Sequence, residues 1–328
     1  MTFRSLVTRP GGPGRRIPSW AGLVIAGSLA AGCSGAPASS PAMVKLSSAE
    51  IAVLTGSVSP VITAELGNAH EVLVQRCMQS KGLAYYPHFV TTAGVTGQQQ
   101  VPGVPGAAIS LAARETDGYG FYSQVMQARA NPGGGQGSFR EETYADSLTG
   151  AAGRRYRLAL DGPDSQRITV TLPGDGTASL LTGGCEGAAN RQLYGSVANT
   201  AQVTTGYSLL YDGFYTTVVS DPKFTAVVAR WSSCMSSRGL KYSTPTTLSN
   251  SLYRRIYTNP APAARDLEIR VAVADYQCAK AVNLVATARR LESEHAQYMS
   301  RPLAQYLALI TRVDISAAKV AKSINPPG

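Results

Sequence analysis

The sequence lacks the short motifs that mark the common catalytic and cofactor-binding sites. It has no G-x-S-x-G nucleophile elbow, no G-x-x-x-x-G-K-[ST] phosphate loop and no C-x-x-C pair. His70-Glu71 lacks the second histidine of a zinc-protease helix, because position 74 is Val74. Glu292-x-x-His295 has no second copy, which a di-iron site would require, so we expect these two residues to form a solvated pair on a helix surface. We therefore expect no metal and no cofactor, and the absence of a catalytic motif favours a protein that is not an enzyme.

One pair of carboxylates keeps an enzymatic alternative open. Glu268 and Asp275 lie on similar faces of a predicted helix, where they could form a catalytic pair. Solvation on the helix surface, or a helix cap, is the interpretation that we favour. The alternative function is an envelope hydrolase or transferase whose site is assembled from dispersed residues.

Charge is also scarce, since charged residues make up 15% of the chain. The formal net charge is +10, but four of the arginines lie within the first 16 residues. Without these four, the rest of the chain holds 26 cations and 20 anions. The cations are scattered, whereas a nucleic-acid binder concentrates them on one face. We expect no nucleic-acid partner, and a weak attraction to anionic lipid or wall polymer.

No hydrophobic run is long enough to form a stable membrane span. The longest, Trp20–Gly32, follows a basic segment and has the length of the apolar core of an export signal. It ends in Leu29-Ala30-Ala31-Gly32-Cys33, which resembles the lipobox of bacterial lipoproteins. We predict a signal peptide over residues 1–32, a lipid on Cys33 and a flexible tether over residues 33–47. An ordinary secretory signal is the alternative. The predicted location is the outer face of the cytoplasmic membrane.

One nine-residue segment occurs twice, as Cys77–Tyr85 and as Cys234–Tyr242, with the shared pattern C-M-x-x-x-G-x-x-Y. Each copy is typical of a helix end, with a cation near the C-terminus and a glycine that stops the helix. Each also has a later companion, at Cys185-x-x-Ala188-x-Asn190 and at Cys278-x-x-Ala281-x-Asn283. We predict a single domain over residues 48–328, with related halves at about 48–205 and 206–328.

With Cys33 lipidated, four cysteines remain in an exported chain, which favours disulfides over a metal site. Three pairings are possible. The repeat favours Cys77–Cys185 and Cys234–Cys278, because each half then makes the same bond.

Hydrophobic periodicity predicts a mainly α fold with a small β-hairpin insert in the first half. Ser47-x-x-Glu50 predicts a capping box at the start of a short helix that ends at Leu54. Residues 167–172 and 177–181 alternate apolar and polar side chains around a Pro-Gly-Asp-Gly turn, which is typical of a hairpin. We expect one long helix over 264–299, a turn-rich segment over 242–262, and long surface loops over 86–106 and 131–137.

Tyrosine is abundant, with 16 residues against 6 phenylalanines and 2 tryptophans. A tyrosine ring offers a flat apolar face with a polar tip, which suits sugar or peptide ligands as well as a half-buried helix face. Two groups are candidate ligand-binding residues: Tyr119, Phe121 and Tyr122 in a glycine-flanked segment, and Tyr207, Tyr211 and Tyr215 at helical spacing.

The twin C-M-x-x-x-G-x-x-Y segments, Ala274-Asp275-x-x-Cys278 and the lipobox together resemble a group of uncharacterised exported lipoproteins of actinobacteria. The resemblance implies the layout from Cys33 onward and brings no catalytic residues. The predicted function is a lipid-anchored, non-enzymatic envelope protein that binds a wall polymer, a peptide or a partner protein.

Overall fold

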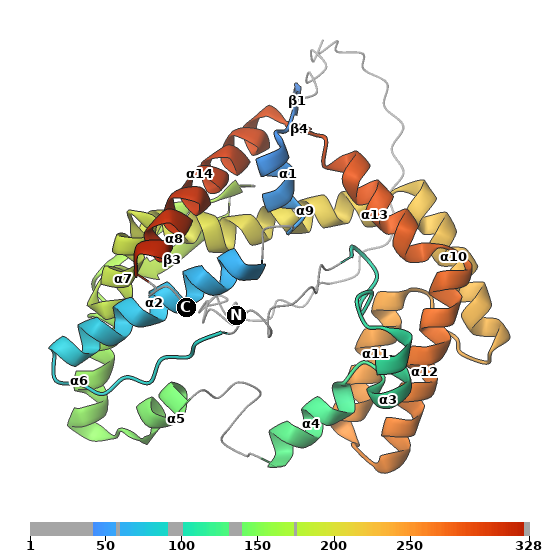
Figure 1. The fold of residues 1–328 in the computed structure, drawn as a ribbon, viewed down its shortest axis with the longest axis horizontal. Coiled ribbons are helices and arrows are strands. Elements are labelled where there is room, and N and C mark those ends of the chain that lie inside the picture. Colours follow the sequence, from blue (N-terminus) through green and yellow to red (C-terminus); the bar gives the residue numbers. More distant parts are fainter. Residues whose placement is uncertain (1–41, 57–59, 91–100, 131–139, 174–175, 325–328) are drawn as a thin grey trace, which may run out of the picture. The chain divides into compact units, whose positions relative to one another are not determined.

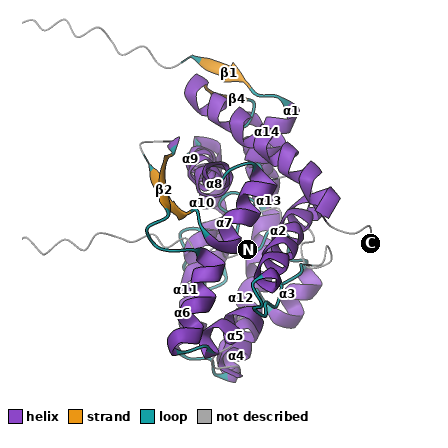
Figure 2. Ribbon diagram, turned by 90° about the vertical axis from the view of Figure 1, so that its left-hand side faces the viewer, coloured by secondary structure: helices purple, strands orange, loops and turns teal. Residues whose placement is uncertain are grey.

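The computed structural model describes residues 42–56, 60–90, 101–130, 140–173 and 176–324. Cys33, the signal segment, residues 33–41 of the predicted tether and the loop 131–137 lie outside these residues. In the rest of the predicted tether, Met43–Lys45 forms a strand and Leu46 is 5% exposed, so the prediction of a flexible segment is wrong for this part. The described residues all belong to one compact unit, Pro41–Gly328. They are mainly helical with a small β-hairpin, which confirms the predicted fold class (Figures 1 and 2).

In chain order, the helices are α1 (Ser48–Leu54), α2 (Pro60–Ser80), α3 (Leu111–Asp117), α4 (Phe121–Ala130), α5 (Arg140–Ser147), α6 (Gly150–Asp161), α7 (Gly184–Tyr194), α8 (Val197–Ala201), the π-helical segment η3 (Gln202–Gly206), α9 (Tyr207–Val219), α10 (Pro222–Ser237), α11 (Pro245–Thr258), α12 (Pro262–Ala281), α13 (Leu284–His295) and α14 (Arg301–Ile324). The strands are β1 (Met43–Lys45), β2 (Arg167–Thr171), β3 (Thr177–Leu181) and β4 (Tyr298–Ser300). β2 pairs antiparallel with β3 as predicted, and β1 pairs antiparallel with β4.

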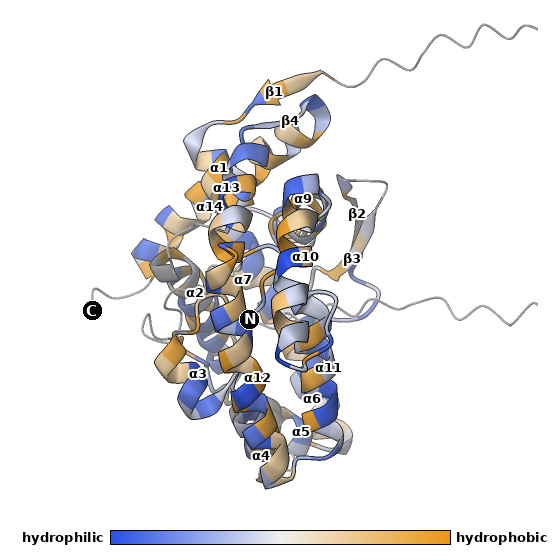
Figure 3. Cartoon of the chain, turned by 90° about the vertical axis from the view of Figure 1, so that its right-hand side faces the viewer, coloured by the Kyte–Doolittle hydropathy of each residue, from blue (hydrophilic) through white to orange (hydrophobic). Residues whose placement is uncertain are grey.

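Local capping sets the start of several helices. Ser47 and Glu50 form the predicted capping box of α1, in which each side chain accepts a backbone N–H of the other residue. Asp221 caps α10 and Pro222 occupies its first turn, where the missing N–H costs nothing. None of the described helices has the length and hydrophobicity to cross a bilayer, and Figure 3 shows hydrophilic residues interspersed along them.

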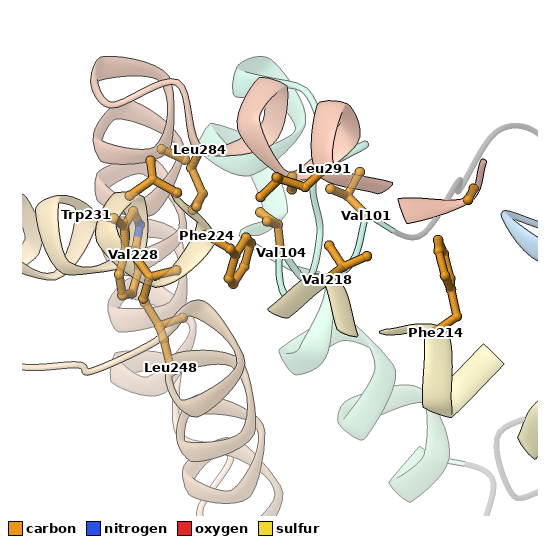
Figure 4. Packing of buried hydrophobic residues seen from close by; sticks show 14 of the residues in the cluster. Val101, Val104, Phe214, Val218, Phe224, Val228, Trp231, Leu248, Leu284 and Leu291 are labelled. Carbon is orange, nitrogen blue, oxygen red and sulfur yellow. The ribbon is translucent and has the colours of Figure 1, made fainter. Parts of the chain in front are cut away.

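The largest buried cluster joins α9–α14 with residues from before α3. Figure 4 shows Val101 and Val104 among the side chains of this cluster, which include Val218, Phe224 and Leu291. The prediction of a surface loop over 86–106 is therefore wrong for its last part. Gly103 packs closely on Phe224: its φ is 72°, and a Cβ there would lie 2.4 Å from the end of the Phe224 ring. The glycines and prolines of 101–106 hide this burial from any periodicity analysis.

Two further expectations fail in the second half of the chain. The segment 242–262 is helical over α11, which buries Leu248, Leu252 and Ile256 at a spacing of four residues. The expected single helix over 264–299 is two helices. They are separated at Asn283, whose φ of 57° is the left-handed conformation that ends a helix.

Both predicted disulfides are present, Cys77–Cys185 and Cys234–Cys278. A second buried cluster surrounds the first bond and joins α2, α6 and α7 with the end of α14. Burial does not follow the predicted division into halves, because α14 packs on α2 while α3 and α4 pack on α12. The relation between the halves therefore stays a prediction.

Candidate functional site

The centre of the candidate site is a buried ion pair between α3 and α12. Arg114 and Asp275 are 2% and 1% exposed, and Arg114 Nη1 lies 2.8 Å from Asp275 Oδ2. The same guanidinium donates to the backbone carbonyls of Gly106, Ile109 and Ala272. A buried arginine is stable only when its donors are paired in this way.

Asp275 accepts two further hydrogen bonds. The Tyr119 hydroxyl donates to it at 2.7 Å and the Trp231 indole N–H at 2.9 Å. Our expectation that Asp275 lies solvated on a helix surface is wrong. Burial, together with Asp275, raises the pKa of Tyr119 well above its ordinary value, so this hydroxyl stays protonated and donates.

Glu268 is fully buried two turns before Asp275 on the same face of α12, and it caps the start of α4. Its carboxylate accepts from the backbone N–H groups of Tyr119, Phe121 and Tyr122, at 2.7–3.0 Å. Burial raises the pKa of Glu268, and these three bonds partly oppose that rise. The helix cap considered in the sequence analysis is therefore present, although Glu268 belongs to α12 and caps the neighbouring helix α4. The prediction that Glu268 is solvated on the helix surface is wrong. Gly118 is required beside it: its φ is 62°, and a Cβ there would lie 2.6 Å from Glu268 Cγ.

This network supports a row of aromatic rings that runs outward to the surface. Tyr119 stacks on Phe121 with ring centroids 5.3 Å apart, and Phe121 meets Tyr253 of α11 edge to face at 5.4 Å. Tyr253 then stacks on Tyr257 at 6.1 Å. The outer two rings are 41% and 62% exposed. Tyr122, the third predicted residue of this segment, packs against the large core cluster.

A groove of about 400 Å³ lies between α4 and α11 at the exposed end of this row. Its lining residues are Gln124, Val125, Ala128, Arg129, Tyr253 and Tyr257. Arg129 Nη2 donates to the backbone carbonyl of Tyr257 at 2.8 Å, which fixes the guanidinium at the groove wall. Apolar faces combined with a few fixed polar groups are the usual composition of a ligand site.

The second predicted tyrosine group forms a separate row on α9. Tyr207 and Tyr211 stack with centroids 6.0 Å apart, and Tyr215 follows at 6.3 Å. Tyr207 and Tyr211 pack against the core cluster, and burial raises the pKa of Tyr207 to about 12. Burial also raises the pKa of the adjacent Glu292 to about 7, which Arg289 opposes only in part. This face is half-buried between helices, in contrast to the groove.

Two of the three histidines pair individually with carboxylates. His70 Nε2 lies 3.1 Å from Glu186, and His295 Nε2 lies 3.0 Å from Asp221. The partner of His295 is thus the α10 cap, and the solvated pair that we expected with Glu292 is not its main contact. Within the described part of the chain, no group of three or more potential metal ligands comes together.

Among the site residues that sequence reasoning missed are Arg114, Trp231, Arg129, Tyr253 and Tyr257. The last two lie four residues apart and could have been found as a tyrosine pair on one helix face, had 242–262 been recognised as helical. Compared with known proteins, the chain matches no family model, no curated protein and no solved structure.

Proposed function

We propose that this protein is a lipid-anchored, non-enzymatic binding protein of the cell envelope, and that the α4–α11 groove binds a component of the cell wall. The observation that carries the proposal is the exposed pair Tyr253 and Tyr257 at the rim of a groove of ligand size. The lipobox at Cys33 supports the location, and two disulfides are typical of exported proteins.

The construction of the site favours binding over catalysis. The aromatic row is anchored on Asp275 and Glu268, whose oxygens are used in hydrogen bonds to neighbouring groups. Such bonds hold the rings in place before a ligand arrives, which reduces the entropy cost of binding. The same bonds occupy the two carboxylates that an enzymatic site would have used, so we do not propose the hydrolase or transferase alternative.

The groove is tested by sedimentation of the detergent-solubilised full chain with insoluble actinobacterial cell wall. Tyr257→Ala removes the most exposed ring of the row, and we expect affinity to fall about three- to ten-fold, as one lost aromatic contact implies. Tyr298→Ala is the matched control, because Tyr298 is 54% exposed on β4, outside the groove. Equal affinity of the two variants, or no sedimentation of the native chain, would contradict the proposed site.

The anchor is tested separately by the intact mass of the native protein. We expect a diacylglyceryl group on Cys33 and accumulation of the uncleaved precursor in the Cys33→Ala variant. A mature, secreted form with an unmodified Cys33 would contradict the location.

A further inference from the structure

The two helices that form the groove carry positive charge and no negative charge. Neither α4 nor α11 contains an aspartate or a glutamate, whereas together they hold Arg129, Arg254 and Arg255, all exposed. In the whole chain, anions and cations are far more evenly mixed, with 20 against 30. The local imbalance favours a ligand that carries negative charge.

Helical geometry places one of the two adjacent arginines beside the tyrosines. Arg254 lies three residues before Tyr257, so the two side chains are neighbours on the surface of α11. Arg255 lies two residues from both Tyr253 and Tyr257, which turns it about 160° away around the helix. Only Arg254 can therefore reach a ligand that is stacked on the tyrosine pair.

Arg129 supplies a second cation on the opposite wall. Its bond to the Tyr257 carbonyl uses one of the five guanidinium N–H donors and fixes the plane of the group. A fixed guanidinium matches the two oxygens of a carboxylate or phosphate. Gln124, which also lines the groove, offers an amide that can both donate to and accept from hydroxyl groups.

We infer that the ligand of the α4–α11 groove is an acidic polysaccharide, whose sugar rings stack on Tyr253 and Tyr257 and whose acid groups bind Arg129 and Arg254. The inference rests on the proposed function and specifies its ligand class. Tyrosine rings pack on the C–H face of a pyranose, the hydroxyls bond to amide and phenol groups, and the arginines neutralise the acid. Single-stranded nucleic acid also combines stacking faces with anions, and it is the competing class that the test must separate.

The experiment measures binding of the detergent-solubilised full chain to oligogalacturonate, to the same oligomer as its neutral methyl ester, and to single-stranded DNA. We expect the acid to bind at least five-fold more tightly than the ester and the DNA, and the preference to shrink in high salt. Arg129→Gln and Arg254→Gln should each weaken binding of the acid about two- to five-fold, the effect of one exposed ion pair. Arg255→Gln removes the same charge from the far side of α11 and should change binding less than either.

Four results would overturn the inference. They are equal binding of acid and ester, tighter binding of DNA, equal losses for Arg254→Gln and Arg255→Gln, and failure of both oligomers to bind. If the chain then still sediments with cell wall in a Tyr257-dependent way, the proposed function stands with a neutral or peptide ligand. Loss of wall binding as well would remove both.

Discussion

The buried Arg114–Asp275 pair makes a sharp prediction about stability. Replacing Arg114 by methionine keeps an unbranched apolar stem but removes a charge and four hydrogen bonds. Asp275 would then lack its cationic partner in a site that is 1% exposed, with only Tyr119 and Trp231 as donors. An uncompensated buried charge is the costly consequence.

Removal of one partner of a buried ion pair typically costs about 3–5 kcal/mol. For a folded unit of this size, that loss lowers the melting temperature on the order of 10 °C. The control is Arg265→Met on the same pair of helices, because Arg265 is exposed and makes one bond, to the Thr116 carbonyl. Such a surface change should cost less than about 1 kcal/mol.

Chemical denaturation of both variants gives the two free energies of unfolding. A second substitution separates charge from packing. If the unpaired carboxylate causes the loss, Asp275→Asn in the Arg114→Met background should recover stability, so that the two effects are strongly non-additive. Equal costs for Arg114→Met and Arg265→Met, or additive effects of Arg114→Met and Asp275→Asn, would refute the reasoning.

Two other predictions concern the disulfides and pH. Replacing Cys234 and Cys278 together by serine opens a loop of 44 residues, and the free energy of unfolding measured in denaturant titrations should fall by about 4 kcal/mol. A loss below about 1 kcal/mol would show that the disulfide hardly restricts the unfolded chain. The folded-state pKa of Glu292 is about 7, above its ordinary 4.5, so its proton stabilises the fold fully below pH 4.5 and this stabilisation is lost as pH rises through 7. The melting temperature should therefore fall between pH 6 and pH 8, a range that lies above the pKa of about 6 for Asp314. Glu292→Gln should make this fall smaller, and an unchanged pH dependence of the melting temperature would contradict the role given to Glu292.

Local signals in the sequence predicted the framework well. The capping box at Ser47 and the hairpin at 167–181 depend on neighbouring residues, and both are present. The disulfide pairing came from internal repetition, a signal that requires no knowledge of packing. These features are specified within short stretches of chain, which is why a single sequence was enough to identify them.

The parts that failed depend on contacts between distant segments. The sequence around Asp275 has an ordinary helical pattern. The burial of Asp275 depends on partners that are distant in sequence, namely Arg114, 161 residues away, together with Tyr119 and Trp231. Val101 and Val104 lie in a tight turn and are buried in the large core cluster. A turn has no repeating hydrophobic pattern, so the sequence gives no sign of this burial. Helix α11 was missed because its many Ser, Thr and Asn residues are also typical of turns, although its buried Leu248, Leu252 and Ile256 repeat every four residues.

The candidate site also combines residues that the sequence identifies locally with residues that only the fold brings together. Tyr119 and Phe121 were identified from their aromatic rings and flanking glycines, and the structure places both in the row that leads to the groove. The groove itself requires α11, so Tyr253 and Tyr257 could not be identified while that helix was missing. Tyrosine spacing alone also cannot distinguish this exposed row from the half-buried one at Tyr207 and Tyr211.

Hydroxyl-radical footprinting tests the central claim, ligand binding in the α4–α11 groove, because it reports the exposure of individual side chains. The full chain in detergent would be oxidised with and without solubilised cell-wall fragments, and the modification of each tyrosine measured by mass spectrometry. We predict that the fragments slow oxidation of Tyr253 and Tyr257 and leave the exposed Tyr298 unchanged. Unchanged oxidation of Tyr253 and Tyr257 while the fragments are bound, or protection of Tyr211 and Tyr215 instead, would contradict the account.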